Sequence, residues 1–220
     1  MSAAVYHDRH DAGRVLAQAL RHYAGQPDTT VLALPRGGVP VAYEVARALD
    51  APLDILLVRK LGAPSQKEFG IGAIAEGKAP VVLLDDRLVR LVDPPPGYVE
   101  EEIAREMAEM TRRRERYAAA REPVDVSGRT VVLVDDGIAT GATARAALRA
   151  LRERGAARVL LAVPVAAAES VAELRLEADD VVCLLAPERM NAVGNFYEDF
   201  SPTADQEVTD LLEAARRHSV

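Results

Sequence analysis

The segment that most constrains this 220-residue chain is a buried-strand pattern that runs directly into two acids and a Gly/Thr turn. Thr130–Val134 is apolar after its first residue, which predicts a strand buried on both faces of a parallel sheet. Asp135 and Asp136 follow, and after the turn comes Ala144–Arg154, which is rich in strong helix formers. This order of strand, acids, turn and helix predicts an α/β fold with a ligand site at the carboxyl end of the strand.

The residues of the turn predict a site for a phosphorylated sugar. The free backbone N–H groups and the positive dipole end of the helix attract a phosphate. The hydroxyls of Thr140 and Thr143 add donors, and Gly141 lets the backbone come close to the ligand. Asp135 and Asp136 can accept hydrogen bonds from a ligand rich in hydroxyls, or hold a hard cation. A ribose 5-phosphate would satisfy both halves of the site.

These residues resemble the signature of the type I phosphoribosyltransferases, in which an apolar strand, two acids and two or three small or apolar residues precede Thr-Gly-x-Thr. Here the segment 135–143 reads Asp-Asp-Gly-Ile-Ala-Thr-Gly-Ala-Thr. Gly137 departs from the family, which usually has an apolar residue there, and is expected to loosen the turn. The alternative is an ordinary strand-turn-helix with a capping threonine. The resemblance implies that the turn binds a ribose 5-phosphate through Ala139, Thr140, Gly141, Ala142 and Thr143.

A second anion site is expected in the loop after the strand predicted over 31–34. Arg36 offers bidentate donors, and Gly37 with its neighbour allows a backbone nest around phosphate oxygens. In the resembled family this loop binds pyrophosphate, often through a strained peptide, and Arg36 and Gly37 match it. Arg59 and Lys60, predicted to close the strand over 53–58, resemble the basic residues that hold pyrophosphate from the adjacent strand end. The alternatives are a helix-capping glycine turn and a solvated strand end.

Alternating strands and helices predict an α/β fold, a doubly wound and mainly parallel sheet. Further strands are expected over 159–163 and 181–185, a hairpin over 71–84, and helices over 11–23, 40–49, 98–121, 169–176 and 205–216. We expect a single phosphoribosyltransferase-like domain over 1–220. Within it, 61–121 is expected to be a lid hairpin and long-helix insertion, and 186–220 a C-terminal hood. The segments 57–64, 68–77 and 192–200 also resemble a bacterial branch of stand-alone phosphoribosyltransferases.

Composition argues against several partners. The formal net charge of −7 disfavours a general nucleic-acid or membrane-surface binder, and no apolar run approaches the ~20 residues that span a bilayer. The single cysteine, Cys183, lies in an apolar run and is expected to be a core residue in a reducing cytoplasm. The basic run over 112–116 hints at RNA, but its alternation with glutamates favours a solvated helix face.

The resemblance implies transfer of the 5-phosphoribosyl group from phosphoribosyl diphosphate (PRPP) to a nitrogenous base, with Asp135, Asp136, Arg36, Lys60 and Mg²⁺ acting on the donor. Ala139 stands where hypoxanthine-guanine enzymes usually have an aspartate, as in the adenine-type pattern of purine salvage.

The acceptor side of the site and the class of function stay open. Phe196 and Tyr197 could stack on a base or belong to the core, and Glu68 or Glu76 could move a proton. A non-catalytic regulator that binds PRPP or nucleotides is the main alternative, followed by a hydrolase. A homodimer through the helix over 98–121 is also expected.

Overall fold

The structure, a computed structural model, describes residues 5–67, 69–77, 79–118 and 124–218. Its main sheet has five parallel strands in the order β2-β1-β6-β7-β8. These strands are β2 (Leu53–Ile55), β1 (Thr29–Ala33), β6 (Thr130–Val134), β7 (Arg158–Val165) and β8 (Asp180–Leu185). The predicted doubly wound, mainly parallel α/β sheet is confirmed.

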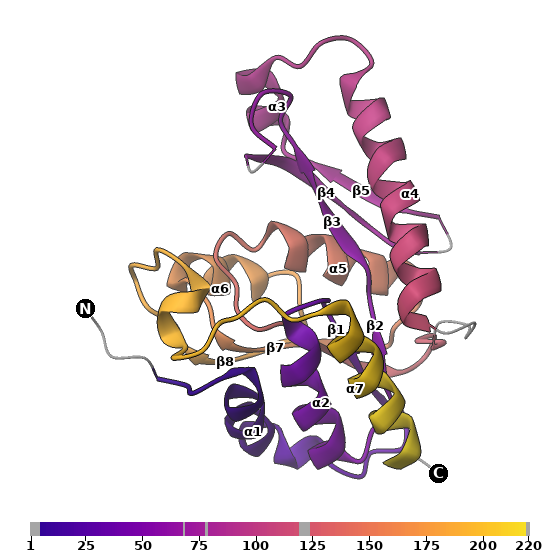
Figure 1. Cartoon of the computed structure of the whole chain (residues 1–220), viewed down its shortest axis with the longest axis vertical. Helices are drawn as coiled ribbons and strands as arrows, with labels where there is room; N and C mark the ends of the chain where they lie inside the picture. The colour runs from indigo at the N-terminus through magenta and orange to yellow at the C-terminus, as the bar shows by residue number, and fades with distance from the viewer. Residues whose placement is uncertain (1–4, 68, 78, 119–123, 219–220) are drawn as a thin grey trace.

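Helices cover both faces of the main sheet (Figure 1). α1 (Arg9–Ala19), α2 (Gly38–Leu49) and α7 (Asp205–His218) lie on one face, and α5 (Ala142–Glu153) and α6 (Ala168–Leu174) on the other. Alternate residues of β6 therefore enter two different cores, Val132 and Val134 the first, Val131 and Leu133 the second. Burial on both faces explains why the strand is apolar at successive positions rather than at every second one.

A smaller antiparallel sheet projects from the main one in Figure 1. It consists of β3 (Val58–Gly62), β4 (Gly70–Ala75) and β5 (Val81–Leu84), and is followed by α3 (Asp86–Val92) and α4 (Tyr98–Ala118). The hairpin predicted over 71–84 is therefore present as β4 and β5. The small sheet packs on α5 through small apolar side chains, which include Ala73, Ala75, Ala146 and Ala150.

The strand predicted over 53–58 is present only as far as Ile55, because the chain changes sheets within that apolar run. β2 ends at Ile55 and β3 begins at Val58. Between them the backbone N–H of Leu57 donates to Glu76 Oε1 at 2.9 Å, and the N–H of Glu76 donates to the Leu57 oxygen at 2.9 Å. These bonds tie the chain to the small sheet at the point where it leaves the large one.

The long helix α4 packs within the chain, against β3, β4 and α7. Its arginines pair with acids: Arg113 Nε lies 2.7 Å from Glu109, and Arg116 lies 2.6 Å from Asp205. Arg112 and Arg113, in that order, lower the pKa of Glu109 to about 2. An ion-paired helix fits this pattern better than an RNA-binding surface. A homodimer stays a prediction.

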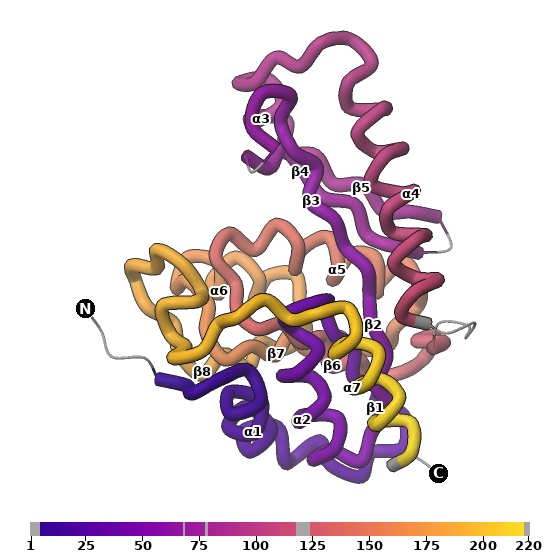
Figure 2. The backbone as a smooth tube through the Cα atoms, in the orientation of Figure 1, coloured from indigo at the N-terminus to yellow at the C-terminus, as the bar shows by residue number. Residues whose placement is uncertain are grey.

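The N-terminal residues before α1 lie beside the segment that follows β8 and precedes α7. Figure 2 traces both segments along the backbone. The backbone N–H of Tyr6 donates to the Phe196 oxygen at 3.0 Å, and that of Glu198 donates to the Tyr6 oxygen at 2.9 Å. Two short 3-10 helices, at Arg21–Tyr23 and Val193–Phe196, complete the fold. Over the described residues, none of the helices has the length and apolar character needed to cross a membrane.

Candidate functional site

Two loops meet at the carboxyl ends of β1 and β6. The strand order reverses between these neighbours, since β2 lies on one side of them and β7 and β8 on the other. Ligands of open α/β sheets bind at such a reversal. The loop after β1 contains Arg36, and the loop after β6 begins at Asp135. The backbone N–H of Leu34 donates to the Val134 oxygen at 2.9 Å, which joins the starts of the two loops.

The predicted acidic pair lies at this reversal, half-buried. Asp135 Oδ1 accepts a hydrogen bond from the backbone N–H of Asp136 at 2.9 Å. Burial, and then the negative charge of Asp136, raises the pKa of Asp135 well above its usual range. Burial also raises the pKa of Asp136, against the opposing effect of Arg9. Ligand hydroxyls or a cation would stabilise the charged forms, so the pair is suited to both.

Arg9, which the sequence analysis did not single out, is the cation beside this pair. Its Nε donates to Asp136 Oδ2 at 2.7 Å, and its side chain is 10% exposed. The predicted helix began at Asp11, whereas α1 begins at Arg9 after an N-cap, Asp8, whose side chain accepts from the Asp11 N–H. Asp8 was the available signal, because aspartate is a preferred N-cap residue. With the helix begun there, Arg9 falls on the buried stripe that contains Leu16.

The turn over 139–143 forms the N-terminus of α5. Gly141 is the N-cap residue and has φ +74°, a left-handed conformation that favours glycine. Ser170 on α6 donates its hydroxyl to the Ala139 oxygen at 2.7 Å, which fixes the turn from the side. Thr140 is exposed and Thr143 is half-buried, and both line a cleft. This arrangement is suited to a phosphate, because the N–H groups of the helix start are unpaired within the helix.

The loop after β1 packs directly against the acidic loop. The peptide bond between Pro35 and Arg36 is cis. A Cβ atom on Gly37 would lie 2.1 Å from Asp136 Oδ2, so only glycine allows this approach. Arg36 is partly exposed and lies 3.7 Å from Asp205 at the start of α7. The structure therefore brings Arg36 and Gly37 next to the predicted sugar-phosphate site.

Arg59 and Lys60 do not close a strand of the main sheet, because both lie within β3. Arg59 Nε donates to Glu106 Oε2 on α4 at 2.6 Å, so its guanidinium is engaged in holding the small sheet. Lys60 instead lines the cleft that contains Thr140 and Thr143. Of the two, Lys60 is the one that lines the same cleft as the turn over 139–143.

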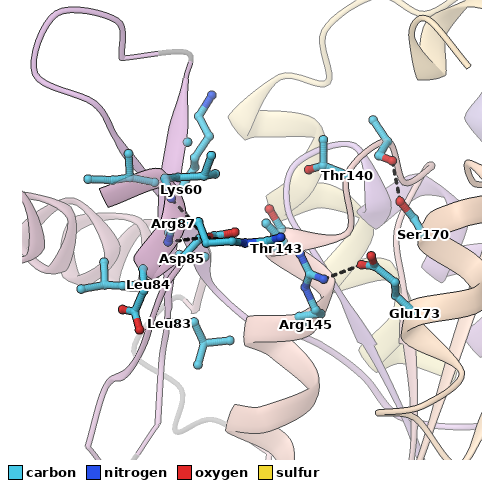
Figure 3. A pocket seen from close by; sticks show the side chains of 18 of the residues that line it. Lys60, Leu83, Leu84, Asp85, Arg87, Thr140, Thr143, Arg145, Ser170 and Glu173 are labelled. Carbon is cyan, nitrogen blue, oxygen red and sulfur yellow. Dashed lines mark hydrogen bonds and ion pairs between the residues drawn. The ribbon is translucent and has the colours of Figure 1, made fainter. Parts of the chain in front are cut away.

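The cleft has a volume of about 1070 Å³ and is lined by the small sheet, α3, α5 and α6. In Figure 3, Lys60, Leu83 and Leu84 lie on one side, and Ser170 and Glu173 on the other. Arg145 on α5 donates from Nη1 to Glu173 Oε2 on α6 at 2.5 Å. The cleft thus opens beside the turn over 139–143, and charged side chains such as Lys60, Arg87 and Arg145 line both of its walls.

Comparison with known sequences decides the family. The family described as phosphoribosyl transferase domain matches residues 4–197. The chain belongs to this family. The match includes both loops at the strand reversal, so the resemblance identified from the segment 135–143 is confirmed.

Relatives of this phosphoribosyl transferase domain come from several bacteria. A Mycobacterium tuberculosis protein named "Putative phosphoribosyl transferase" is 46% identical over 213 residues, which cover 97% of this chain and 47% of that protein. The chain thus spans about half the length of that relative. The crystal structure of a Thermus thermophilus protein, TT1426, is similar with a TM-score of 0.78 and 44% identity, over 94% of this chain and 97% of that one. The "Bifunctional protein PyrR" of a Roseiflexus strain is 32% identical over 160 residues, 68% of this chain and 62% of that protein.

Gly137, the departure from the family signature, has a local explanation. A Cβ atom there would lie 2.4 Å from Val193 Cγ1 and 3.1 Å from Val165 Cγ1. Val193 therefore fills the space that a larger residue at 137 would take. The turn also keeps its anchor, because the backbone N–H of Ile138 donates to the Val165 oxygen at 2.9 Å. The expected loosening of the turn is not seen.

The two aromatic residues predicted to contact a base differ in their surroundings. Tyr197 is 5% exposed, and its ring packs 5.5 Å from Tyr6 and 5.0 Å from Phe200, measured between ring centroids. Its hydroxyl donates to the backbone oxygen of Asp136 at 2.6 Å. Of the two alternatives for Tyr197, the structure favours packing over base stacking. Phe196 is half-buried, and its role in base binding stays a prediction.

Replacing Tyr197 by phenylalanine is expected to lower stability, because the backbone oxygen of Asp136 loses the hydroxyl that donates to it. The expected loss is about 1–3 kcal/mol, or roughly 2–4 °C in Tm for each kcal/mol in a chain of this size. Thermal unfolding followed by circular dichroism checks this. The matched control is Tyr43→Phe at a half-buried ring beside Arg47, expected to change stability by less than about 0.5 kcal/mol. An unchanged Tm for Tyr197→Phe would contradict the supporting role.

The structure adds no support for proton transfer by Glu68 or Glu76. Glu76, which directly follows β4, accepts hydrogen bonds from the Leu57 N–H and from the Arg114 guanidinium, so it joins the link between β2 and β3 to α4. Glu68 lies outside the described residues. A general acid or base for the acceptor is therefore not assigned.

Proposed function

We propose that this chain transfers the 5-phosphoribosyl group from PRPP to a nitrogenous base and releases pyrophosphate. The observation that carries the proposal is the meeting of three features at one strand reversal: the acidic pair, the helix-start turn and the Arg36 loop. Each suits one part of the donor, namely the ribose hydroxyls, the 5-phosphate and the diphosphate. Membership in the family supports the same donor.

The proposed roles follow from the charge that develops during the reaction. Breaking the bond between C1 of the ribose and the diphosphate oxygen makes the ribose more positive and the diphosphate more negative. Groups that are positioned beforehand stabilise such charges at the lowest cost. In this proposal Asp135 and Asp136 hold the ribose hydroxyls, and the turn over 139–143 anchors the 5-phosphate. Arg36 and Lys60 lie toward the diphosphate.

The carboxylate oxygens of Asp135 and Asp136 are of the kind that Mg²⁺ prefers as ligands. Two adjacent carboxylates with raised pKa values offer oxygen ligands, and a bound cation would stabilise their charged forms. We propose that Mg²⁺ is held by substrate oxygens and by Asp135, with Asp136 beside it. When bound, it would offset the negative charge of the leaving diphosphate.

The acceptor is left open within the nitrogenous bases. Ala139 stands where hypoxanthine-guanine enzymes usually have an aspartate, and its methyl group cannot transfer a proton. This disfavours the hypoxanthine-guanine class. The cleft beside the turn is larger than a free base needs, so the acceptor panel should include substituted bases.

The test incubates the pure chain with PRPP, Mg²⁺ and a panel of purines, pyrimidines and related bases. Pyrophosphate release is followed, and new nucleotides are identified by mass. We expect one class of base to give a nucleotide, and chelation of Mg²⁺ to abolish its formation. PRPP binding without any product would support the regulator instead. If the chain neither bound PRPP nor formed a product, the interpretation of the segment 135–143 would be overturned.

A further inference from the structure

The N-terminal helix α1 and the segment 197–201 converge on one of the two acids, Asp136. Arg9 donates from Nε to Asp136 Oδ2 at 2.7 Å and from Nη1 to the Ser201 oxygen at 2.8 Å. Its guanidinium carbon lies 3.9 Å from the centre of the Phe200 ring. Tyr197 donates to the backbone oxygen of the same Asp136. An N-terminal helix and a C-terminal segment thus hold both the carboxylate and the backbone of Asp136.

The two acids differ in how far they are already engaged. Asp136 has an ion pair with Arg9, and its Oδ2 packs against the backbone of Gly37. Asp135 accepts a hydrogen bond from the Asp136 N–H, and within the described part of the chain it makes no ion pair. A buried ion pair with further hydrogen bonds is costly to separate. A ligand that approaches the pair therefore finds Asp136 fixed and Asp135 in need of a partner.

We propose that Arg9 is a positioning residue that fixes Asp136 beside the donor, and that Asp135, which has no ion pair among the described residues, is the acid that depends on the donor for a partner. This inference rests on the proposed function, since it concerns how the same site binds PRPP. Arg9 also contacts Phe200 and Ser201, so the segment 197–201 helps to hold Arg9 against Asp136. The affinity for PRPP then depends on how α1 packs against the segment 197–201, and both lie outside the turn over 139–143 and the Arg36 loop.

The test measures PRPP binding by titration calorimetry in the presence of Mg²⁺, at a temperature well below the Tm of every variant. Arg9→Met is expected to weaken binding about tenfold or more, because a charge-assisted hydrogen bond is lost. Arg9→Lys keeps the charge and should recover part of the affinity. The matched control is Arg14→Met on the same helix, where the side chain is 52% exposed and pairs with Asp11. It should bind PRPP as the unaltered chain does.

Two further measurements separate positioning from a general loss of structure. Asp136→Asn combined with Arg9→Met should bind PRPP no more weakly than the worse single variant, because both remove one shared interaction. Phe200→Leu removes the ring below the guanidinium and leaves the ion pair, so it should weaken binding by a smaller factor; it also serves if Arg9→Met does not fold. If Arg9→Met folds and its affinity for PRPP is unchanged, this inference is overturned and the proposed function is not. If only Phe200→Leu folds, an unchanged affinity in that variant has the same meaning. Failure of the unaltered chain to bind PRPP would overturn the proposed function and this inference together.

Discussion

Replacing Asp135 by asparagine is expected to lower the rate of pyrophosphate release from PRPP by about two to three orders of magnitude, as loss of one preorganised group typically does. Asparagine keeps the shape of the side chain and removes its charge. The charge matters because Asp135 has no cation of its own among the described residues and is the carboxylate left for the ligand. Initial rates at saturating PRPP, with the best base from the panel, give the measurement.

The same variant should not lose stability, which separates a chemical effect from misfolding. The pKa of Asp135 is raised in the folded chain, so the folded state binds this proton more tightly than the unfolded state. Its ionisation therefore lowers stability as pH rises from the unfolded pKa of about 3.9 through the raised folded value. Asparagine does not ionise. The Tm of Asp135→Asn relative to the unaltered chain should be higher at pH 7.5 than at pH 4.

The control for this substitution is Asp50→Asn. Asp50 is exposed at the end of α2 and has φ +53°, a conformation that asparagine tolerates. Rate and Tm should both stay close to those of the unaltered chain. A fully active Asp135→Asn enzyme would remove Asp135 from the site. Loss of activity together with a large fall in Tm at pH 7.5 would instead show that the carboxylate supports the fold.

The fold was largely predictable because its signals are local. The strand over 130–134 and the hairpin over 71–84 follow from short apolar runs and the breaks between them. The break between β2 and β3 was missed, because the apolar run over 53–58 continues through it. Leu56 and Leu57 are buried although neither lies in a strand, so burial alone did not mark the end of β2. Side chains from other elements, Glu76 among them, decide where the chain turns.

The site was predictable only as far as its loops. The segment 135–143 and the Arg36 loop carry their own chemistry in consecutive residues. Arg9 lies 127 residues from Asp136 in sequence, and Tyr197 contacts Asp136 from 61 residues away. No local periodicity encodes such a contact. Arg59 shows the converse, since its strand-end context suggested an anion site, whereas Glu106 on α4 accepts its hydrogen bond.

Gly37→Ala is expected to reduce turnover by about two orders of magnitude, because a displacement of about 1 Å at a catalytic group can cost that much. The added Cβ atom would lie 2.1 Å from Asp136 Oδ2 and 2.7 Å from its Cγ. Either Asp136 or the loop after β1 must then move. Asp136 is held by Arg9, so the strain falls on the Arg36 loop as well. The loops after β1 and β6 are expected to separate.

The cost should also appear in stability, at about 1–3 kcal/mol for an overpacked site. Thermal unfolding and pyrophosphate release are measured on the same preparation. Gly97→Ala is the matched control, because Gly97 has φ +82° with open space around it and lies away from both loops. It should lose about 1 kcal/mol or less from its backbone conformation and keep its rate. If Gly37→Ala kept its rate while losing the same stability, contact between Gly37 and Asp136 would matter for packing only. A fall in rate well beyond that of the control would mean that the approach of the two loops is itself part of the catalytic geometry, since a methyl group changes no charge and removes no donor.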